Sequence, residues 1–280
     1  MHIIVTEAKP LLEILATLSP ESSKTTLRSW MKDGRITVDE QVVRQGNVVI
    51  EKGKKVALGV KVHSMPGGIK IVYEDKHFVA IEKPSGLLSV STAFEKGDTA
   101  HGFLKKHFHP RKVSVVHRLD QDTSGVMLFA LSEEGYDGLK KLFEVHSIER
   151  SYCAIIEGKL NPPEGTWQSN LYEDSQYVVH STEDQTFGRI AITHYSTKKS
   201  NARYSCLDLK LETGRKNQIR VHCNDHGHPV VGDKKYGSLV DPIHRLCLHA
   251  QLIAFEHPVT KKEMRFISPL PASFERLIGK

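Results

Sequence analysis

Two apolar runs separated by a short polar segment constrain the middle of the chain more than any other feature. The segment 117–125 reads His-Arg-Leu-Asp-Gln-Asp-Thr-Ser-Gly, the β-branched run 113–116 precedes it, and the apolar run 126–130 follows it. This order is typical of a strand, a polar loop and a second strand. Arg118 and Asp120 are therefore predicted to lie on a loop between two core strands, where proteins often place reactive groups.

The length and the amino-acid usage bound the architecture. At 280 residues, 39% of them hydrophobic, the chain is long enough for one large domain and a small one. No apolar stretch approaches the roughly 18 residues of a membrane span, and the N-terminal residues lack the layout of a secretory signal. The four cysteines lie far apart without a Cys-x-x-Cys pair, which predicts reduced thiols in a cytoplasmic protein.

The balance of charge favours a polyanionic partner. The formal net charge is +6 and the sequence pI is about 9.0, and a basic field attracts the phosphates of nucleic acids. Many soluble proteins are mildly basic without binding nucleic acid, so the position of particular residues has to decide between the two interpretations.

The N-terminal part of the chain is predicted to form a separate unit. Residues 10–18 begin with a proline, which suits a first helical turn, and carry an apolar face. Ser22 or Ser23 can cap a second helix that ends at the Asp-Gly pair 33–34. Short strands are predicted at 35–38, at 41–43 after the turn Asp39-Glu40, and near 56–62. The turn-rich segment 65–68 separates a domain of residues 1–64 from one of residues 65–280.

Three cations repeat along the second predicted helix. Lys24, Arg28 and Lys32 recur at every fourth position and therefore share one face. A solvated helix face is the plain interpretation of such a repeat. The segment that follows the helix, Gly34-Arg35-Ile36-Thr37-Val38, adds a second basic position.

This unit resembles the S4 RNA-binding domain, whose motif joins a basic helix to Gly-Arg-x-x-Val. The residues that carry the resemblance are Lys24, Arg28, Lys32, Gly34, Arg35 and Val38. It covers roughly residues 3–62. The resemblance implies that the four cations contact RNA.

The remainder of the chain predicts an α+β domain around a mostly antiparallel sheet, because strand-like runs outnumber helical patterns. The predicted strands are 69–73, 78–82, 113–116, 126–131, 152–157, 190–195, 203–211 and 248–255, and the predicted helices are 133–144 and 217–225. The stretch 159–189 contains Asn161-Pro162-Pro163 and scattered polar residues, so it is interpreted as an excursion from the core.

Five segments of residues 70–275 resemble, in order, the RluA family of RNA pseudouridine synthases, which is named for the large ribosomal subunit. They are the Lys-Pro-Ser-Gly turn after strand 78–82, the segment 117–125, Arg150-Ser151-Tyr152, the segment 213–222, and the closing strand with Leu248-His249-Ala250. One position pair departs from the family. Lys216-Asn217 stands where Thr-His is usual, and altered substrate contacts are expected there.

The resemblance implies an RNA-modifying isomerase that needs no cofactor or metal and is expected to act as a monomer. It assigns Asp120 as the catalytic carboxylate, Arg220 as its cationic partner, and Tyr152 and Ile219 as the residues that hold the uracil. It also implies that Arg118 assists flipping of the target base and that His117 and Arg215 contact RNA. Ribosomal RNA is the expected substrate, and a synthase acting on tRNA would carry the same catalytic residues.

Pseudouridine formation explains why these residue types are needed. The bond from ribose C1′ to uracil N1 breaks and the base rejoins through C5, without any redox change. An ionised carboxylate can attack C1′ or act as a base toward the sugar, and a nearby cation keeps it ionised. A base inside a helical stack has to be flipped out before either step.

Each of these residues also has a plainer interpretation. Asp120 and Asp122 could both be turn formers that cap their own backbone, and Ser124 lacks the Gly-x-Ser-x-Gly setting of a hydrolase nucleophile. His222, Cys223, His226 and His228 lie close together in the sequence but lack the Cys pairs usual in structural zinc sites. A non-catalytic RNA-binding or ribosome-assembly protein on the same scaffold is the functional alternative.

Overall fold

The chain divides into two compact units, Met1–Ser64 and Met65–Lys280. The structure is a computed structural model that describes residues 1–39, 41–59, 63–91, 97–184 and 186–279. Glu40 of the predicted turn and residues 60–62 of the predicted strand 56–62 lie outside the described residues.

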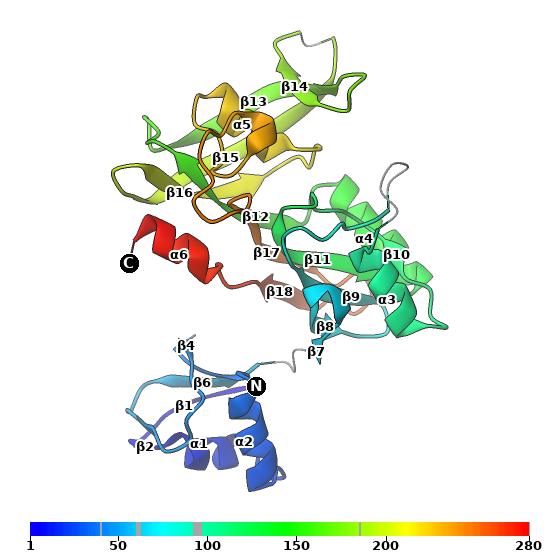
Figure 1. Cartoon of the computed structure of the whole chain (residues 1–280). Helices are drawn as coiled ribbons and strands as arrows, with labels where there is room; N and C mark the ends of the chain where they lie inside the picture. The colour runs from blue at the N-terminus through cyan, green and yellow to red at the C-terminus, as the bar shows by residue number, and fades with distance from the viewer. Residues whose placement is uncertain (40, 60–62, 92–96, 185, 280) are drawn as a thin grey trace. The chain divides into compact units, whose positions relative to one another are not determined.

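The N-terminal unit is a small α/β unit (Figure 1). Its elements are β1 (His2–Ile4), β2 (Lys9–Pro10), α1 (Leu11–Leu18), α2 (Lys24–Lys32), β3 (Ile36–Val38), β4 (Gln41–Val42), β5 (Val49–Ile50) and β6 (Lys55–Leu58), and β7 (His63–Ser64) lies at the boundary. Both predicted helices are confirmed, and Ser23 caps α2 by accepting the backbone N–H of Thr26. Leu11, Leu15 and Leu27 are almost completely buried in its core.

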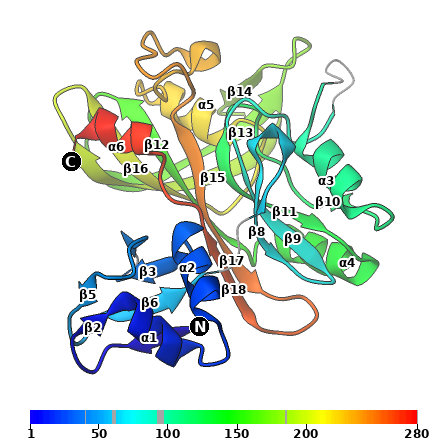
Figure 2. The same ribbon diagram turned by 60° about the horizontal axis from the view of Figure 1, so that its bottom comes forward.

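The C-terminal unit is built on one long, mostly antiparallel sheet (Figures 1 and 2). Its elements are η1 (Pro66–Gly68), β8 (Lys70–Glu74), β9 (Phe78–Lys83), α3 (Ala100–Phe108), β10 (Ser114–Val115), β11 (Ser124–Ala130), α4 (Glu133–Glu144), β12 (Glu149–Glu157), β13 (Glu164–Glu173), β14 (Val179–Thr182), β15 (Arg189–Ser200), β16 (Tyr204–Leu211), α5 (Gln218–Asp225), η2 (Lys234–Tyr236), β17 (Leu248–Glu256), β18 (Glu263–Ile267) and α6 (Ala272–Ile278). The strand order is β14-β13-β15-β16-β12-β17-β11-β9-β8, with β10 paired to β11 and β18 to β17. The α+β prediction with a mostly antiparallel sheet is therefore confirmed.

The prediction that residues 159–189 leave the core is wrong. Strand β13 pairs with β15 along its length, and β14 pairs with β13. Trp167, Leu171 and Val179 are buried from this stretch. Much of β13 is exposed, and few of its residues are apolar. Its sequence therefore lacks the regular alternation of apolar and polar residues that predicts a strand.

Helices α3 and α6 are also absent from the sequence prediction. Helix α3 buries Ala100, Leu104 and Phe108, which are four residues apart, and Thr99 caps it by accepting the N–H of Gly102. Lysine and histidine residues fill the exposed positions of α3 and lower its overall apolar content. The cap and the four-residue spacing were the signals that could have predicted this helix.

The sheet contains a parallel contact next to the polar loop 117–125. Strands β11 and β17 run parallel, with Ser124 opposite His249 and Gly125 opposite Ala250. Gly125 has a φ of +120°, and a Cβ at this position would lie 2.1 Å from the carbonyl oxygen of Ala250. Only glycine therefore allows the two backbones to approach this closely.

Gly125→Ala is expected to destabilise the protein by about 3 kcal/mol or more, because it combines a backbone clash with an unfavourable φ. Urea denaturation followed by circular dichroism measures the change. Gly86→Ala is the matched control, since Gly86 has a φ of +85° but nothing within 4 Å of the added Cβ. The control should cost only ~1–2 kcal/mol, and equal losses for the two variants would show that close packing at Gly125 is unimportant.

Candidate active site

Asp120 lies in a pocket of the C-terminal unit, on the loop that joins β10 to β11. Its side chain is 24% exposed. The pocket gathers residues from that loop, from β12, from α5 and from the loop before α5. Its lining consists of Arg118, Leu119, Asp120, Thr123, Tyr152, Leu211, Arg215, Asn217, Gln218, Ile219, Arg220 and Leu248. The structure therefore brings Asp120 together with Arg118, Tyr152, Arg215, Ile219 and Arg220, which the sequence predicted as site residues.

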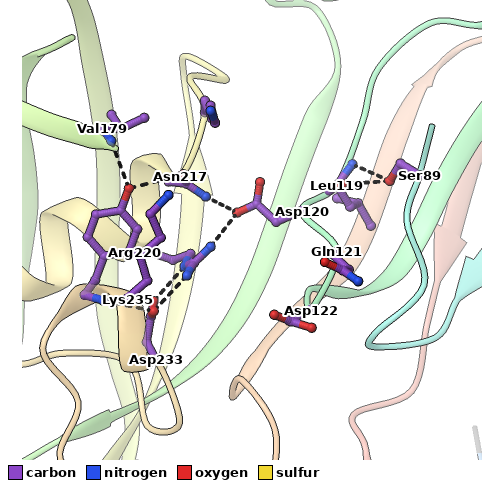
Figure 3. Close-up of polar contacts among 12 residues, drawn as sticks. Ser89, Leu119, Asp120, Gln121, Asp122, Val179, Asn217, Arg220, Asp233 and Lys235 are labelled. Carbon is purple, nitrogen blue, oxygen red and sulfur yellow. Dashed lines mark hydrogen bonds and ion pairs between the residues drawn. The ribbon is translucent and has the colours of Figure 1, made fainter. Parts of the chain in front are cut away.

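The two oxygens of the Asp120 carboxylate have different surroundings (Figure 3). Oδ2 accepts a hydrogen bond of 2.6 Å from Nδ2 of Asn217 and lies 3.4 Å from Nη1 of Arg220. Oδ1 accepts no hydrogen bond from any of the described residues. One oxygen is thus held by the protein while the other remains available to a substrate.

Arg220 contacts Asp120, as the sequence predicted. It is held mainly by Asp233, a partner that the sequence analysis did not identify. The guanidinium donates from Nε to Asp233 Oδ2 at 2.6 Å and from Nη2 to Oδ1 at 2.8 Å. The Asp233 side chain is 0% exposed, and the ring of Tyr236 lies 4.9 Å from the guanidinium carbon. Burial opposes the charged form, but the hydrogen bonds and charge of Asp233, with a smaller contribution from Asp120, raise the pKa of Arg220. The cation beside Asp120 is therefore permanent.

Lys83, the last residue of β9, holds the loop that carries Asp120 through hydrogen bonds to backbone carbonyl groups. The buried Lys83 donates from Nζ to the carbonyl oxygens of Pro84, Leu87 and Gln121 at 2.7–2.9 Å. Burial lowers the pKa of Lys83 to about 7, although the nearby charges of Asp122 and Asp120 act in the opposite direction.

Ser89, in the segment after β9, forms hydrogen bonds to the same loop. Ser89 donates from Oγ to the carbonyl oxygen of Leu119 at 2.7 Å and accepts the backbone N–H of Leu119 at 3.2 Å. Asp122, the second carboxylate of the loop, is exposed, and no hydrogen bond joins its side chain to Asn217 or Arg220 (Figure 3). The position of Asp120 is thus set by backbone contacts on both sides of it.

Tyr152 reaches the pocket from β12 at an irregular point of the sheet. The pairing of β12 with β17 shifts register between Ser151 and Tyr152, and such bulges re-aim side chains. Tyr152 packs against two core clusters at once. Burial raises its pKa, as does the charge of Asp120, against the opposing charge of Arg150. Its hydroxyl therefore keeps its proton at neutral pH.

The remaining predicted residues of this unit differ in how they are held. Arg118 is exposed, Ile219 is 4% exposed, and Arg215 donates from Nε to the carbonyl oxygen of Ile190 at 2.9 Å. His117 accepts the backbone N–H of Leu128 at its Nε2. Burial, assisted by the charge of Arg150, lowers the pKa of His117 to about 3. His117 is therefore neutral and holds β11, while an RNA contact by it remains a prediction.

Three of the four predicted cations of the N-terminal unit share a pocket. Lys24, Arg28 and Lys32 line it together with Arg44, which the sequence analysis missed. Arg44 donates from Nη1 to the carbonyl oxygen of Lys32 at 2.6 Å. Arg35 is not among the lining residues: its guanidinium carbon lies 5.2 Å from the centre of the Trp30 ring.

The histidines that raised the question of a metal site take part in hydrogen bonds. His222 contacts Thr193 and Ser169, His226 contacts the carbonyl oxygen of His222, and His228 contacts that of Glu157. No group of three or more potential ligands is placed to bind a metal within the part of the chain that the structure describes.

The serine and cysteines considered in the sequence are buried. Ser124 accepts a hydrogen bond from Arg245 and pairs with His249, between two core strands. All four cysteines are free and buried. No helix of the described residues is long and apolar enough to cross a membrane.

Comparison with known proteins identifies the family. The family described as RNA pseudouridylate synthase matches residues 77–225, which contain Asp120, Tyr152 and Arg220. The chain is 33% identical over 269 residues to the uncharacterized RNA pseudouridine synthase YhcT of Bacillus subtilis, covering 92% of this chain and 88% of that protein. The chain belongs to the RluA-type RNA pseudouridine synthases. It is an isomerase, which sets aside the non-catalytic alternative.

A second relative and a solved structure are also similar to the chain. The synthase is 32% identical to ribosomal large subunit pseudouridine synthase D of Pseudomonas aeruginosa, over 95% of this chain and 90% of that protein. The solved structure of human RNA pseudouridylate synthase domain containing 1 superposes with a TM-score of 0.61 at 24% identity, covering 72% of this chain and 84% of that one. That likeness shows the fold alone.

Arg220→Met is expected to destabilise the synthase by about 3–5 kcal/mol, because it leaves the Asp233 carboxylate buried without its cation. Adding Asp233→Asn should recover most of the loss, whereas adding Asp120→Asn should recover little, since Asp120 is partly exposed. Urea denaturation of the single and double variants gives the coupling energies. Strictly additive effects of Arg220→Met and Asp233→Asn would contradict the pairing.

Proposed function

We propose that this synthase isomerises uridines of ribosomal RNA and that Asp120 performs the chemistry at C1′ of the flipped nucleotide. The observation that carries the proposal is the asymmetry of the carboxylate: Oδ2 is held by Asn217 and Arg220, and Oδ1 is available in the pocket. Ribosomal RNA is supported by the relatives of 31–32% identity that are named ribosomal large subunit pseudouridine synthase D.

The residues around Asp120 suit the steps of the isomerisation. The ionised carboxylate attacks C1′ or removes a proton from the sugar, with the permanent positive charge of Arg220 beside it. Tyr152 offers an aromatic face to the uracil and a protonated hydroxyl, and Ile219 packs against the base from α5. Arg118, which is exposed at the mouth of the pocket, stabilises the gap that the flipped base leaves.

The N-terminal unit is proposed to be an S4-like domain that binds the RNA backbone. Exposed cations from α2 and from the segment after β4 surround one pocket, and such charges bind phosphates without selecting bases. This unit would supply affinity, while the catalytic unit selects the uridine. The synthase is proposed to act as a monomer, which is compatible with the contacts that Asn217 and Arg220 of the same chain make to Asp120. The four free, buried cysteines suit a reducing cytoplasm.

Asp120→Asn is expected to abolish pseudouridine formation while leaving RNA affinity within about threefold, because the amide keeps the shape but is neither nucleophile nor base. Pseudouridines are mapped in total RNA from cells that lack the gene and that express either the wild-type or the variant protein. Sites restored in large-subunit ribosomal RNA only by the wild type would support the proposal. Sites restored only in tRNA would refute the ribosomal substrate, and pseudouridine made by purified Asp120→Asn would refute the role of Asp120.

Replacing Lys24, Arg28 and Lys32 together by Gln is expected to lower the salt dependence of RNA binding. Removing three phosphate contacts should reduce the slope of log K against log salt by about 2–3, with little change in the single-turnover rate at saturating enzyme. The control replaces Lys52, Lys76 and Lys262 by Gln, which removes the same charge from other exposed positions. Equal slopes for the two triple variants would contradict the proposed phosphate-binding face.

A further inference from the structure

Asn217 adopts an unusual conformation directly beside the catalytic carboxylate. It precedes α5 with a φ of 54° and a ψ of 14°, in the left-handed region, and is 9% exposed. Its side chain makes no capping hydrogen bond to α5. Asparagine, aspartate, histidine and glycine tolerate this backbone conformation better than other residues, and here it directs the side-chain amide toward Asp120 (Figure 3).

The orientation of the Asn217 amide is decided by Tyr236. The backbone N–H of Val179 donates to the Tyr236 hydroxyl at 3.2 Å, and that hydroxyl donates to Oδ1 of Asn217 at 3.2 Å. Burial raises the pKa of Tyr236, although the N–H of Val179 acts in the opposite direction, so the hydroxyl keeps the proton that it donates. With its oxygen facing Tyr236, the amide presents its NH₂ group to Asp120 Oδ2 at 2.6 Å.

We infer that Asn217, oriented by Tyr236, is a positioning residue that fixes the Asp120 carboxylate for reaction. The amide occupies Oδ2 and so directs Oδ1 into the substrate pocket. Arg220 alone would not do this, because its two shorter hydrogen bonds go to Asp233 and its contact with Asp120 is 3.4 Å long. The inference rests on the proposed catalytic role of Asp120 and adds an aligning residue to it.

An amide suits this position because it donates a hydrogen bond at every pH and brings no charge. Arg118 and Arg215 line the same pocket as Asp120. Arg220 from α5, Lys83 from β9, Tyr152 from β12 and Tyr236 from η2 also interact with Asp120 electrostatically. Replacing the amide by a carboxylate of the same shape would place two acidic groups 2.6 Å apart. Two carboxylates at that distance share a proton instead of both ionising.

Asn217→Asp is therefore expected to lower the single-turnover rate at neutral pH by about 100-fold and to move the acidic limb of the rate profile upward by about 1–3 pH units. Single-turnover pseudouridine formation on a fixed RNA substrate from pH 5 to pH 9 measures both effects. RNA affinity, measured at the same pH values, should change by no more than about threefold. A merely structural role for Asn217 would lower the rate equally at all pH values.

Two further variants separate the donor from the backbone conformation. Asn217→Gly and Asn217→His both tolerate a positive φ, but only the histidine ring can donate to Asp120. The histidine variant should be at least about tenfold faster than the glycine variant, because hydrogen-bonded alignment of the catalytic group is retained. Tyr236→Phe, which keeps Asn217 but frees its amide to rotate, should lose rate without moving the acidic limb.

Each outcome decides between clear alternatives. Equal rates for the glycine and histidine variants, or an unshifted acidic limb in a folded Asn217→Asp protein, would overturn the inference. If Asn217→Asp fails to fold by circular dichroism, the comparison of glycine with histidine still decides. The Asp120→Asn variant separates failure of this inference from failure of the proposed function. Pseudouridine formation by that variant would show that the Asp120 carboxylate is not catalytic.

Discussion

The site depends on one buried ion pair, between Arg220 of α5 and Asp233 of the segment before η2. Both hydrogen bonds of this pair are short, and the Asp233 side chain has no contact with solvent. A buried guanidinium is unfavourable unless it is paired, so the pair fixes α5 against the segment that carries Asp233. Only with the guanidinium anchored in this way can its remaining Nη1 face Asp120 at a constant distance.

Strand pairing brings the other parts of the site together. Strands β12, β17 and β11 are neighbours, so Tyr152 on β12 lies two strands from the start of β11, where the loop of Asp120 ends. The close approach of Gly125 to Ala250 and the register shift beside Tyr152 both occur here. Irregularities of this kind re-aim side chains and end regular pairing next to sites. The rigid sheet thus places the aromatic ring and the carboxylate in one pocket.

The hairpin of β13 and β14 contributes to the site without lining its pocket. Val179, the first residue of β14, donates to Tyr236, which contacts Asn217 and stacks on Arg220. The stretch interpreted from sequence as an excursion therefore supports two residues that touch Asp120. Its sparse apolar residues are buried against β15 and α5, which explains how a polar-looking segment is held firmly.

The sequence by itself predicted many of the local elements and the candidate site residues. The apolar runs around the segment 117–125 predicted the strand, loop and strand, helix α4 was predicted with its observed bounds, and the segment 213–222 brought Arg220 to attention. These signals are local, because periodicity and capping depend on residues a few positions apart. Lys216-Asn217 stood out only as a departure from the family.

Tertiary structure alone decided which of these residues touch. Asn217 and Arg220 meet Asp120 across 97 and 100 positions of sequence, and the preference of Arg220 for Asp233 over Asp120 is set by which carboxylate is buried. Burial, hydrogen-bond direction and strand register arise from non-local packing, which no local pattern encodes. The sequence singled out Asp120 as the candidate catalytic carboxylate, and the fold decided which of its oxygens is held by Asn217 and Arg220.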